Sequence, residues 1–277
     1  LHGLPIGVKD LLATDDMPTT YGSRIYANYQ PGFDAACVAV ARQQGAVVVG
    51  KTVSTEFATF QPNQTRNPLR LTHTPGGSSS GSAAAVADNM VPLAIGTQTA
   101  GSLIRPASYC GIVAFKPSFG CIARAGAKLL SDTLDTVGTM ARTVPDAALF
   151  AVAMSGRHAW LVKPLNEVLS RPLRIGICRT YEWSQAGVDT QNALANAERL
   201  LKKERIFEVK DLKLPADFET LAKADLPPVA DVAQVVEESV LRSDEPGKPM
   251  GAEAVTKIAP ASNGGQISVP RVVDDES

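Results

Sequence analysis

Residues 34–51 read DAACVAVARQQGAVVVGK, and this stretch decides the fold class. Its first part has the small apolar residues of a helix, with Asp34 as the predicted N-cap and Gly45 as the predicted C-cap. Residues 46–49 then form an unbroken apolar run, which is typical of a strand buried on both faces. A helix that leads directly into such a strand predicts an α/β layer architecture.

The alternation of helices and apolar strands continues on both sides of this stretch. PIGVKDLL, residues 5–12, predicts a short strand that runs into Lys9 and Asp10. The segment from Asp189 to Glu204 is the clearest amphipathic helix in the chain. Further strands are predicted at 91–96, 173–178 and 207–212, and further helices at 83–89 and 145–154. We therefore expect an α/β/α sandwich with a mixed, largely parallel central sheet and helices on both of its faces.

Composition restricts the class of protein. The 277 residues are 44% hydrophobic and 20% charged with a net charge of −1, values typical of a soluble globular protein. The small net charge gives no electrostatic reason to expect nucleic acid or a membrane surface as a partner. No apolar run is long enough to span a bilayer, and the N-terminus does not resemble a secretion signal. We expect a cytoplasmic protein whose oligomeric state the sequence does not determine.

Cysteine and histidine are scarce, and their spacing argues against a metal site. No pair of cysteines has the CxxC spacing and no pair of histidines has the HxxxH or HxH spacing, so neither type of ligand set is expected. The cysteines are interpreted as buried thiols. A nucleophilic serine in this chain would have to find its proton acceptor elsewhere. The residues concerned are Cys37, Cys110, Cys121, Cys178, His2, His73 and His158.

Two segments rich in glycine and serine, residues 76–82 and 96–102, are candidates for chemistry. By themselves they could be a flexible linker and a tight turn. A phosphate-binding loop requires a lysine after its last glycine, but Ser82 follows Gly81. The pattern GxSxG at 77–81 would make Ser79 a nucleophile with His158 as its base, but the strand that this motif requires before it is absent.

A serine activated by a lysine remains. A buried lysine has a lowered pKa, because desolvation disfavours the ammonium form, and the neutral amine can then act as a base. Lys9, on the apolar segment 5–12, is the candidate. The competing interpretation is a surface lysine paired with Asp10.

Three segments together resemble the amidase signature family. GLPIGVKD at 3–10 is similar to the lysine motif of that family, PGGSSSGSAAAVA at 75–87 to its first serine segment, and GTQTAGSLIRPASYCGIVAFKPSFG at 96–120 to its second. The resemblance covers about residues 1–180, with GAVVVGKTVSTEFA and LDTVGTMAR as accompanying stretches. It implies an enzyme that hydrolyses a small-molecule amide and requires no metal and no cofactor.

The resemblance also implies roles for particular residues. Lys9 matches the catalytic lysine, Ser102 the nucleophile and Ser78 the serine that bridges them. The family pattern includes a cis peptide bond before the bridging serine, here Gly77–Ser78. The residues themselves could not distinguish Ser78 from Ser79, Ser80 and Ser82. The implied oxyanion hole consists of the backbone N–H groups of Thr99, Ala100, Gly101 and Ser102, and the implied supporting loop contains Gly76, Gly77 and Ser79.

The chain also departs from the family pattern. Where the commonest pattern is GTDTGGSIRxP, this chain has Gln98 and Ala100, and its arginine, Arg105, stands one place later, directly before Pro106. These features resemble free-standing amidases more than the subunit that amidates misacylated tRNA, and they leave a structural role for Arg105 open. A protein like that amidotransferase subunit and a catalytically impaired amidase fragment are the alternative functions.

Family members are usually longer than this chain, so we expect it to be truncated at both ends. Residues 1–215 are predicted to form a partial amidase signature core. Residues 216–277 match nothing in the family, are acidic and contain one possible helix, 229–241. They have little apolar surface to offset the entropy of ordering, so we expect a poorly ordered tail.

Overall fold

The computed structural model describes residues 1–156, 172–204, 206–213, 262–263 and 266–267. The chain divides into two compact units, 1–168 and 169–277, which are described separately. The boundary between these units, at residues 168 and 169, lies before residue 215, where the family core is predicted to end. The end of the family core at residue 215 remains a prediction. The possible helix at 229–241 lies outside the described residues.

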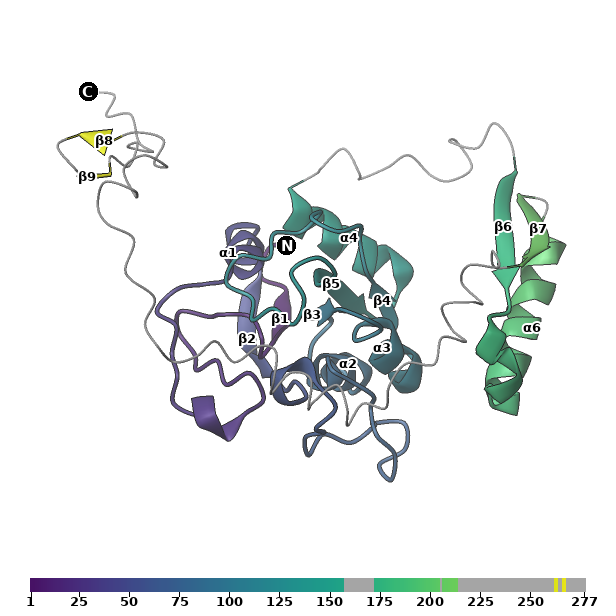
Figure 1. The fold of residues 1–277 in the computed structure, drawn as a ribbon, viewed down its shortest axis with the longest axis horizontal. Helices are drawn as coiled ribbons and strands as arrows, with labels where there is room; N and C mark the ends of the chain where they lie inside the picture. Colours follow the sequence, from purple (N-terminus) through teal and green to yellow (C-terminus); the bar gives the residue numbers. More distant parts are fainter. Residues whose placement is uncertain (157–171, 205, 214–261, 264–265, 268–277) are drawn as a thin grey trace, which may run out of the picture. The chain divides into compact units, whose positions relative to one another are not determined.

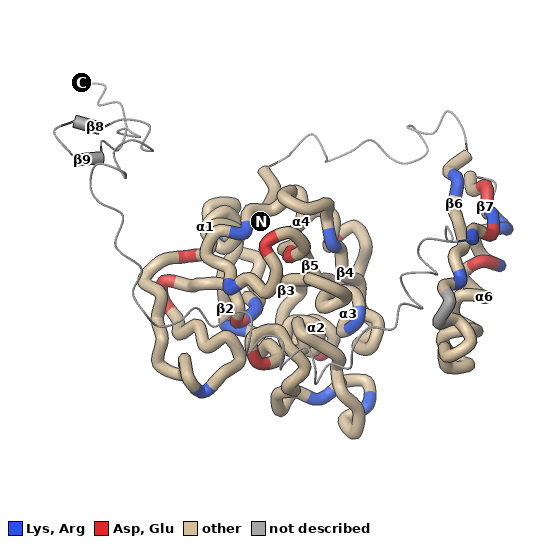
Figure 2. Tube along the Cα trace, in the orientation of Figure 1, with Lys and Arg blue, Asp and Glu red and all other residues tan. Residues whose placement is uncertain are grey.

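The first unit is built on a mixed five-stranded sheet with the strand order β2-β1-β3-β5-β4. Strand β1 pairs in parallel with both β2 and β3, whereas β5 pairs antiparallel with β3 and β4. Neither β3 nor β5 contains a charged residue, and both are tan in Figure 2. The bounds are β1 (Pro5–Lys9), β2 (Val47–Thr52), β3 (Leu93–Gln98), β4 (Val113–Phe115) and β5 (Thr136–Ala141).

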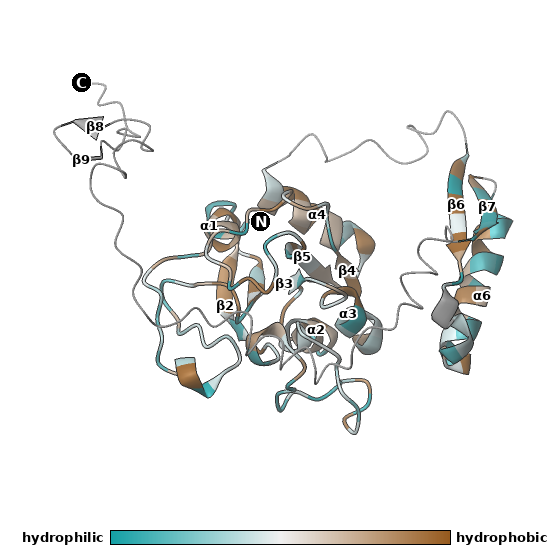
Figure 3. Cartoon of the chain, viewed as in Figure 1, coloured by the Kyte–Doolittle hydropathy of each residue, from teal (hydrophilic) through white to brown (hydrophobic). Residues whose placement is uncertain are grey.

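Helices cover both faces of this sheet (Figure 1). Helices α1 (Ala36–Gln43) and α4 (Val144–Ser155) pack on one face, and α2 (Ser80–Ala87) and α3 (Ile104–Cys110) on the other. Each pair encloses its own cluster of buried apolar side chains, and Figure 3 shows the apolar character of α4. The predicted α/β class, with a mixed sheet between two helical layers, is confirmed.

Side-chain alternation along β1 directs Lys9 toward the α2 side. Ile6 and Val8 belong to the apolar cluster under α1 and α4. Successive side chains of a strand point to opposite faces, so Gly7 and Lys9 face the layer that contains α2. The strand ends at Lys9 and is shorter than predicted from residues 5–12.

The second unit contains the elements predicted near its start. Strands β6 (Leu173–Cys178) and β7 (Phe207–Leu212) have the bounds predicted for two strands, and they pair in parallel. Helix α6 (Val188–Lys203) contacts β7 and matches the predicted amphipathic helix. The described part of this unit also contains η4 (Tyr181–Gln185) and an antiparallel pair of short strands, β8 (Ser262–Asn263) and β9 (Gln266–Ile267).

The predicted N-cap of α1 is wrong. The residue that caps this helix is Ala35, without a side-chain hydrogen bond. Asp34 instead accepts a hydrogen bond from the backbone N–H of Asp15 at 2.9 Å and lies 3.0 Å from Arg42 Nε. Tertiary partners thus take the carboxylate that the local pattern assigned to the helix end.

No helix in the described ranges is long and apolar enough to cross a membrane.

Candidate active site

Lys9 is fully buried and contacts only uncharged groups. Its Nζ donates to Ser78 Oγ at 2.8 Å and to Thr97 Oγ1 at 2.8 Å, with the Thr97 carbonyl oxygen at 3.5 Å. Burial lowers the pKa of Lys9 from 10.5 to about 7, against a smaller opposing effect of the Asp135 charge. A substantial fraction of this lysine is therefore a neutral amine at neutral pH.

The alternative pairing of Lys9 with Asp10 is wrong. Asp10 follows Lys9 directly, so its side chain leaves the strand on the other side and meets Lys51 of β2. Lys51 Nζ lies 3.0 Å from Asp10 Oδ1 and also donates to Thr19 Oγ1 at 2.7 Å. The carboxylate next to Lys9 in sequence thus compensates the charge of another lysine.

The first glycine- and serine-rich segment is buried against its surroundings and is not a linker. The Gly77–Ser78 peptide bond is cis, as the resemblance implied. Gly76 has a φ of +79°, and a Cβ built on it would lie 3.0 Å from Pro106 Cα, so the close approach requires glycine. The Ser78 carbonyl accepts from Thr55 N at 3.1 Å, and the Ser78 side chain is almost fully buried.

Hydrogen bonds separate Ser78 from the other serines of this segment. Ser79 Oγ donates to the Thr97 carbonyl at 3.1 Å, and Ser82 Oγ donates to the Ile95 carbonyl at 3.0 Å. Ser79 is fully buried, which excludes it as the exposed nucleophile of a GxSxG motif. Its proposed partner His158 lies outside the described residues. Among the four serines, Ser78 is the one whose hydroxyl contacts Lys9.

The second glycine- and serine-rich segment, residues 96–102, connects β3 to α3, and the side chain of Gln98 fixes this connection. Gln98 Oε1 accepts from the backbone N–H groups of Leu103 at 2.9 Å and Ile104 at 3.1 Å. Thr99 Oγ1 donates to Asp135 Oδ1 at 2.5 Å. The loop that carries Ser102 is therefore fixed from both of its sides. Gln98 and Asp135 were not predicted as site residues, because an amide or a carboxylate that orients backbone leaves no local pattern in sequence.

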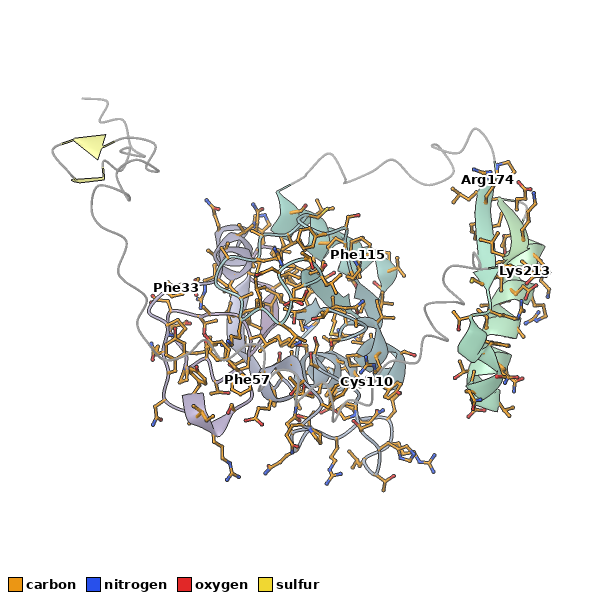
Figure 4. The ribbon with its side chains drawn as sticks, viewed as in Figure 1. Phe33, Phe57, Cys110, Phe115, Arg174 and Lys213 are labelled. Atoms are coloured by element: carbon orange, nitrogen blue, oxygen red, sulfur yellow. The ribbon has the colours of Figure 1, made fainter. Side chains whose placement is uncertain are left out.

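The two serine segments meet at one cavity of about 500 Å³. Ser79 N donates to the Ser102 carbonyl at 3.2 Å and so joins the segments. Among the described residues the Ser102 hydroxyl has no hydrogen-bond partner, so Ser78 and Ser102 share the cavity without a direct bond between them. The cavity is lined by Thr55 and Ala58, on either side of Phe57, and by Arg105 and Tyr109 of α3. Figure 4 labels Phe57 and Cys110, which lie on these two segments. Of the predicted residues, it is lined by Gly76, Gly77, Ser78, Thr99, Ala100 and Ser102.

Among the described residues, no cysteine lines the cavity. Cys37 and Cys110 are buried, and burial raises their pKa values to about 12 and about 11, which keeps the thiols protonated. Cys121 and Cys178 are only half-buried, contrary to their interpretation as buried thiols. Within the described ranges, no group of three or more histidine, cysteine or acidic side chains could hold a metal ion.

Comparison with known proteins shows the family of this chain. The family model described as Amidase matches residues 1–256, and the chain belongs to this amidase (amidase signature) family. It is 47% identical over 162 residues to a glutamyl-tRNA(Gln) amidotransferase subunit of Desulforapulum autotrophicum, covering 56% of this chain and 33% of the relative. For the subunit of the same name from Roseiflexus castenholzii the identity is 39% over 233 residues, with coverages of 78% and 47%. The chain thus spans about a third to a half of the length of these curated relatives.

Solved structures of the family have the same fold. The chain superposes with a TM-score of 0.68 and 30% identity on the corresponding glutamyl-tRNA(Gln) amidotransferase subunit of Thermotoga maritima, covering 86% of this chain and 60% of the other. The native peptide amidase of Stenotrophomonas maltophilia gives a TM-score of 0.65 and 32% identity, with coverages of 86% and 57%. Its structural relatives therefore include both an amidotransferase subunit and a peptide amidase.

Proposed function

We propose that this chain hydrolyses the C–N bond of a carboxamide, with Ser102 as nucleophile and Ser78 and Lys9 as its proton relay. The observation that carries the proposal is the environment of Lys9, which is fully buried and 2.8 Å from Ser78 Oγ. A lysine with a pKa of about 7 can exist as the free amine at neutral pH. Membership of the amidase family supports the same chemistry.

The first half of the reaction forms an acyl-enzyme. The two N–H groups of a neutral Lys9 amine can donate to the two oxygens of Thr97. The lone pair of the Lys9 nitrogen is then available to accept the proton of Ser78. Ser78 gives its proton to Lys9 and takes the proton of Ser102, whose oxygen bonds to the amide carbonyl carbon. The relay returns the proton to the leaving nitrogen, and the C–N bond breaks.

The second half releases the acid. A water molecule gives a proton to the relay and attacks the ester carbonyl, and Ser102 leaves with a proton returned by the same route. In both halves the carbonyl oxygen becomes an oxyanion. The backbone N–H groups of residues 99–102 are the proposed donors to it, and a single such donor is commonly worth about 3 kcal/mol in the transition state.

The second candidate function is that of one component of an amidotransferase. The observation in its favour is the name of the curated relatives, which are glutamyl-tRNA(Gln) amidotransferase subunits. Gln98 and Ala100 are the departures that favour a free-standing amidase. We propose the same triad for both functions, which differ in their partners. Co-purification of the tagged chain with further subunits from its native cells would favour the amidotransferase, and isolation of the chain without them the amidase.

A fluorophosphonate probe tests the nucleophile. We expect mass spectrometry to find the probe on Ser102 in the wild-type chain and no labelling in Ser102→Ala. Ser108→Ala is the matched control, since Ser108 is an exposed serine of α3 outside the cavity, and it should be labelled like the wild type. Ammonia release from a panel of primary amides gives the activity itself. An unlabelled wild-type chain that releases no ammonia would contradict the proposal, and the catalytically impaired fragment would then be the better description.

A further inference from the structure

Asp135 is a buried carboxylate that directly precedes β5. The antiparallel register pairs Gln98, the last residue of β3, with Thr136, the first residue of β5. One step beyond this pair, Thr99 and Asp135 stand opposite each other. The pairing of two strands that are distant in sequence thus brings a carboxylate to the loop that carries Ser102.

The carboxylate of Asp135 joins two segments of the cavity wall. Its Oδ1 accepts from Thr99 Oγ1 at 2.5 Å. Its Oδ2 accepts from the backbone N–H groups of Leu130 at 2.6 Å and Ser131 at 3.1 Å. Thr99 and Leu130 both line the cavity. The position of each segment therefore depends on the same side chain.

No lysine or arginine in the described part of the chain forms an ion pair with Asp135. A buried carboxylate loses its hydration, and here three hydrogen bonds compensate that loss in place of a cation. Its charge acts on Lys9, because Asp135 raises the pKa of Lys9 against the larger effect of burial. Asp135 is thus an unpaired negative charge in the surroundings of the proposed base.

The other charged groups near Lys9 belong to fixed contacts. Asp10 and Lys51 pair with each other, and α2 and β3 contain no charged residue. Arg105 and Tyr109 are the titratable side chains of the described residues that line the cavity, and Arg105 donates to the Ala100 carbonyl. All of these groups are unchanged in the variants compared below.

Thr99 is the first residue of the proposed oxyanion loop, residues 99–102. A backbone donor stabilises an oxyanion when its N–H group points at the place that the oxygen takes in the transition state, and the loss of one donor commonly lowers kcat about 100- to 1,000-fold. Gln98 fixes the end of this loop next to α3. The contact of Thr99 with Asp135 fixes the end next to β3.

We propose that Asp135 is a positioning residue of the reaction, which aligns the backbone donors of residues 99–102 through Thr99 and stabilises the ammonium form of Lys9 with its charge. This inference rests on the proposed amidase function. In that reaction Lys9 becomes an ammonium while the amide oxygen becomes an oxyanion, so Asp135 acts on both ends of the charge separation. The competing interpretation is that Asp135 only orders the turn at residues 130 and 131.

Two substitutions of Thr99 test the positioning. Thr99→Val removes the hydroxyl group at a similar volume, and Thr99→Ser keeps it. With the primary amide that the wild type hydrolyses fastest, Thr99→Val should lower kcat about 10- to 100-fold with little change in KM, because the donors act in the transition state. Thr99→Ser should stay close to the wild type. A wild-type kcat in Thr99→Val, or a loss confined to KM, would overturn the inference.

The pH dependence of kcat tests the charge. The rate rises with pH as Lys9 loses its proton, and the midpoint of this rise follows the pKa of Lys9. Removal of a negative charge disfavours the ammonium, so Asp135→Asn should move the midpoint to lower pH. Thr99→Val keeps the charge and should leave the midpoint in place, although its kcat is lower. A midpoint that is the same in Asp135→Asn and the wild type would overturn the role of the charge.

Asp132→Asn is the matched control, because Asp132 is an exposed aspartate three residues before Asp135. Its kcat and its midpoint should equal those of the wild type. If Asp135→Asn does not fold, the comparison of Thr99→Val with Thr99→Ser decides the inference, since both variants keep the contacts of Asp135 with residues 130 and 131.

A titration of Lys9 by nuclear magnetic resonance separates failure of this inference from failure of the proposed function, because it requires no turnover. The resonance of Lys9 Cε is followed in the wild type and in Asp135→Asn. A lower midpoint in Asp135→Asn supports the effect of the charge even if the wild type hydrolyses no amide. Equal midpoints overturn it, while hydrolysis of the amide by the wild type would leave the proposed function intact.

Discussion

Two lysines on neighbouring strands, Lys9 of β1 and Lys51 of β2, differ in the charge of the groups that they contact. Burial lowers the pKa of both. Lys51 has the Asp10 carboxylate at 3.0 Å, which opposes that shift and compensates its charge. Lys9 has only hydroxyl and carbonyl oxygens within hydrogen-bond distance. The comparison shows that a buried lysine can act as a base only where no carboxylate lies within hydrogen-bond distance. A buried lysine that pairs with a carboxylate keeps its charge and has a structural role.

The largest expected effect is the loss of activity in Lys9→Met compared with Lys51→Met. Methionine fills a similar volume without a titratable group. Removal of the general base should lower kcat for the amide by about 1,000-fold. Lys51→Met should lower it by less than about tenfold, because Lys51 contacts Asp10 and Thr19 and does not line the cavity. Ammonia release at substrate saturation measures both, and equal losses in the two variants would end the distinction between them.

The two hydroxyls around Lys9 give the next largest contrast. Ser78 Oγ and Thr97 Oγ1 lie at the same distance of 2.8 Å from Nζ. Only Ser78 lies on the proposed proton path, so Ser78→Ala should slow fluorophosphonate labelling of Ser102 by about 100-fold or more. Thr97→Val removes an oxygen that only orients the amine and should slow it by about threefold to tenfold. Stronger slowing in Thr97→Val than in Ser78→Ala would show that Ser78 is not the relay hydroxyl.

For stability, in contrast to activity, we expect Lys51 to matter more than Lys9 at neutral pH. Lys51→Met leaves the largely buried Asp10 without its ion-pair partner, and we expect a loss of about 3 kcal/mol in the free energy of unfolding. The double variant Asp10→Asn/Lys51→Met removes the uncompensated charge and should recover at least half of that loss. Urea titration of the three proteins measures this. A double variant as unstable as Lys51→Met would show that packing, and not charge, sets the cost.

The smallest effect, for a change of one pH unit, is a pH dependence of stability due to Lys9. In the unfolded chain Lys9 keeps its proton up to its ordinary pKa of 10.5, whereas the folded chain releases it at about 7. Between these values unfolding takes up a proton, so the folded state becomes more stable as the pH rises, by up to about 1.4 kcal/mol per pH unit. Lys9→Met lacks this contribution. The stability of the wild type relative to Lys9→Met should therefore increase from neutral to alkaline pH, and a constant difference would contradict the lowered pKa.

Much of this site could be predicted from the sequence, because its parts are local patterns. The apolar run before Lys9 placed that lysine on a strand, and the resemblance selected Ser78 and Ser102. The partner of Asp10 could not be predicted, because Lys51 comes from another strand and only the sheet register brings them together. The same holds for the contacts of Gln98 with the first turn of α3 and of Asp135 with Thr99.

The fold was predictable to a similar extent. Strands β6 and β7 match the segments 173–178 and 207–212, which were predicted as strands. The strand β5 was not predicted as a strand, because its sequence TVGTMA has no continuous apolar run, although it is buried along its whole length. Burial there comes from pairing with β3 and β4 and from α4, which are contacts between distant segments. Asp34 was assigned wrongly for the same reason, since Arg42 and the backbone of Asp15 compete for its carboxylate.

The central claim is that Lys9 is a neutral amine near pH 7, and a titration of its side chain by nuclear magnetic resonance tests this most directly. Lysine labelled with carbon-13 at Cε gives one resonance per lysine, and the resonance missing from Lys9→Met identifies Lys9. The account predicts a midpoint of about 7 for this resonance, whereas exposed lysines titrate at about 10.4. A Lys9 midpoint of about 10 or above would contradict the account, because the amine would then be protonated at neutral pH and could not accept the proton of Ser78.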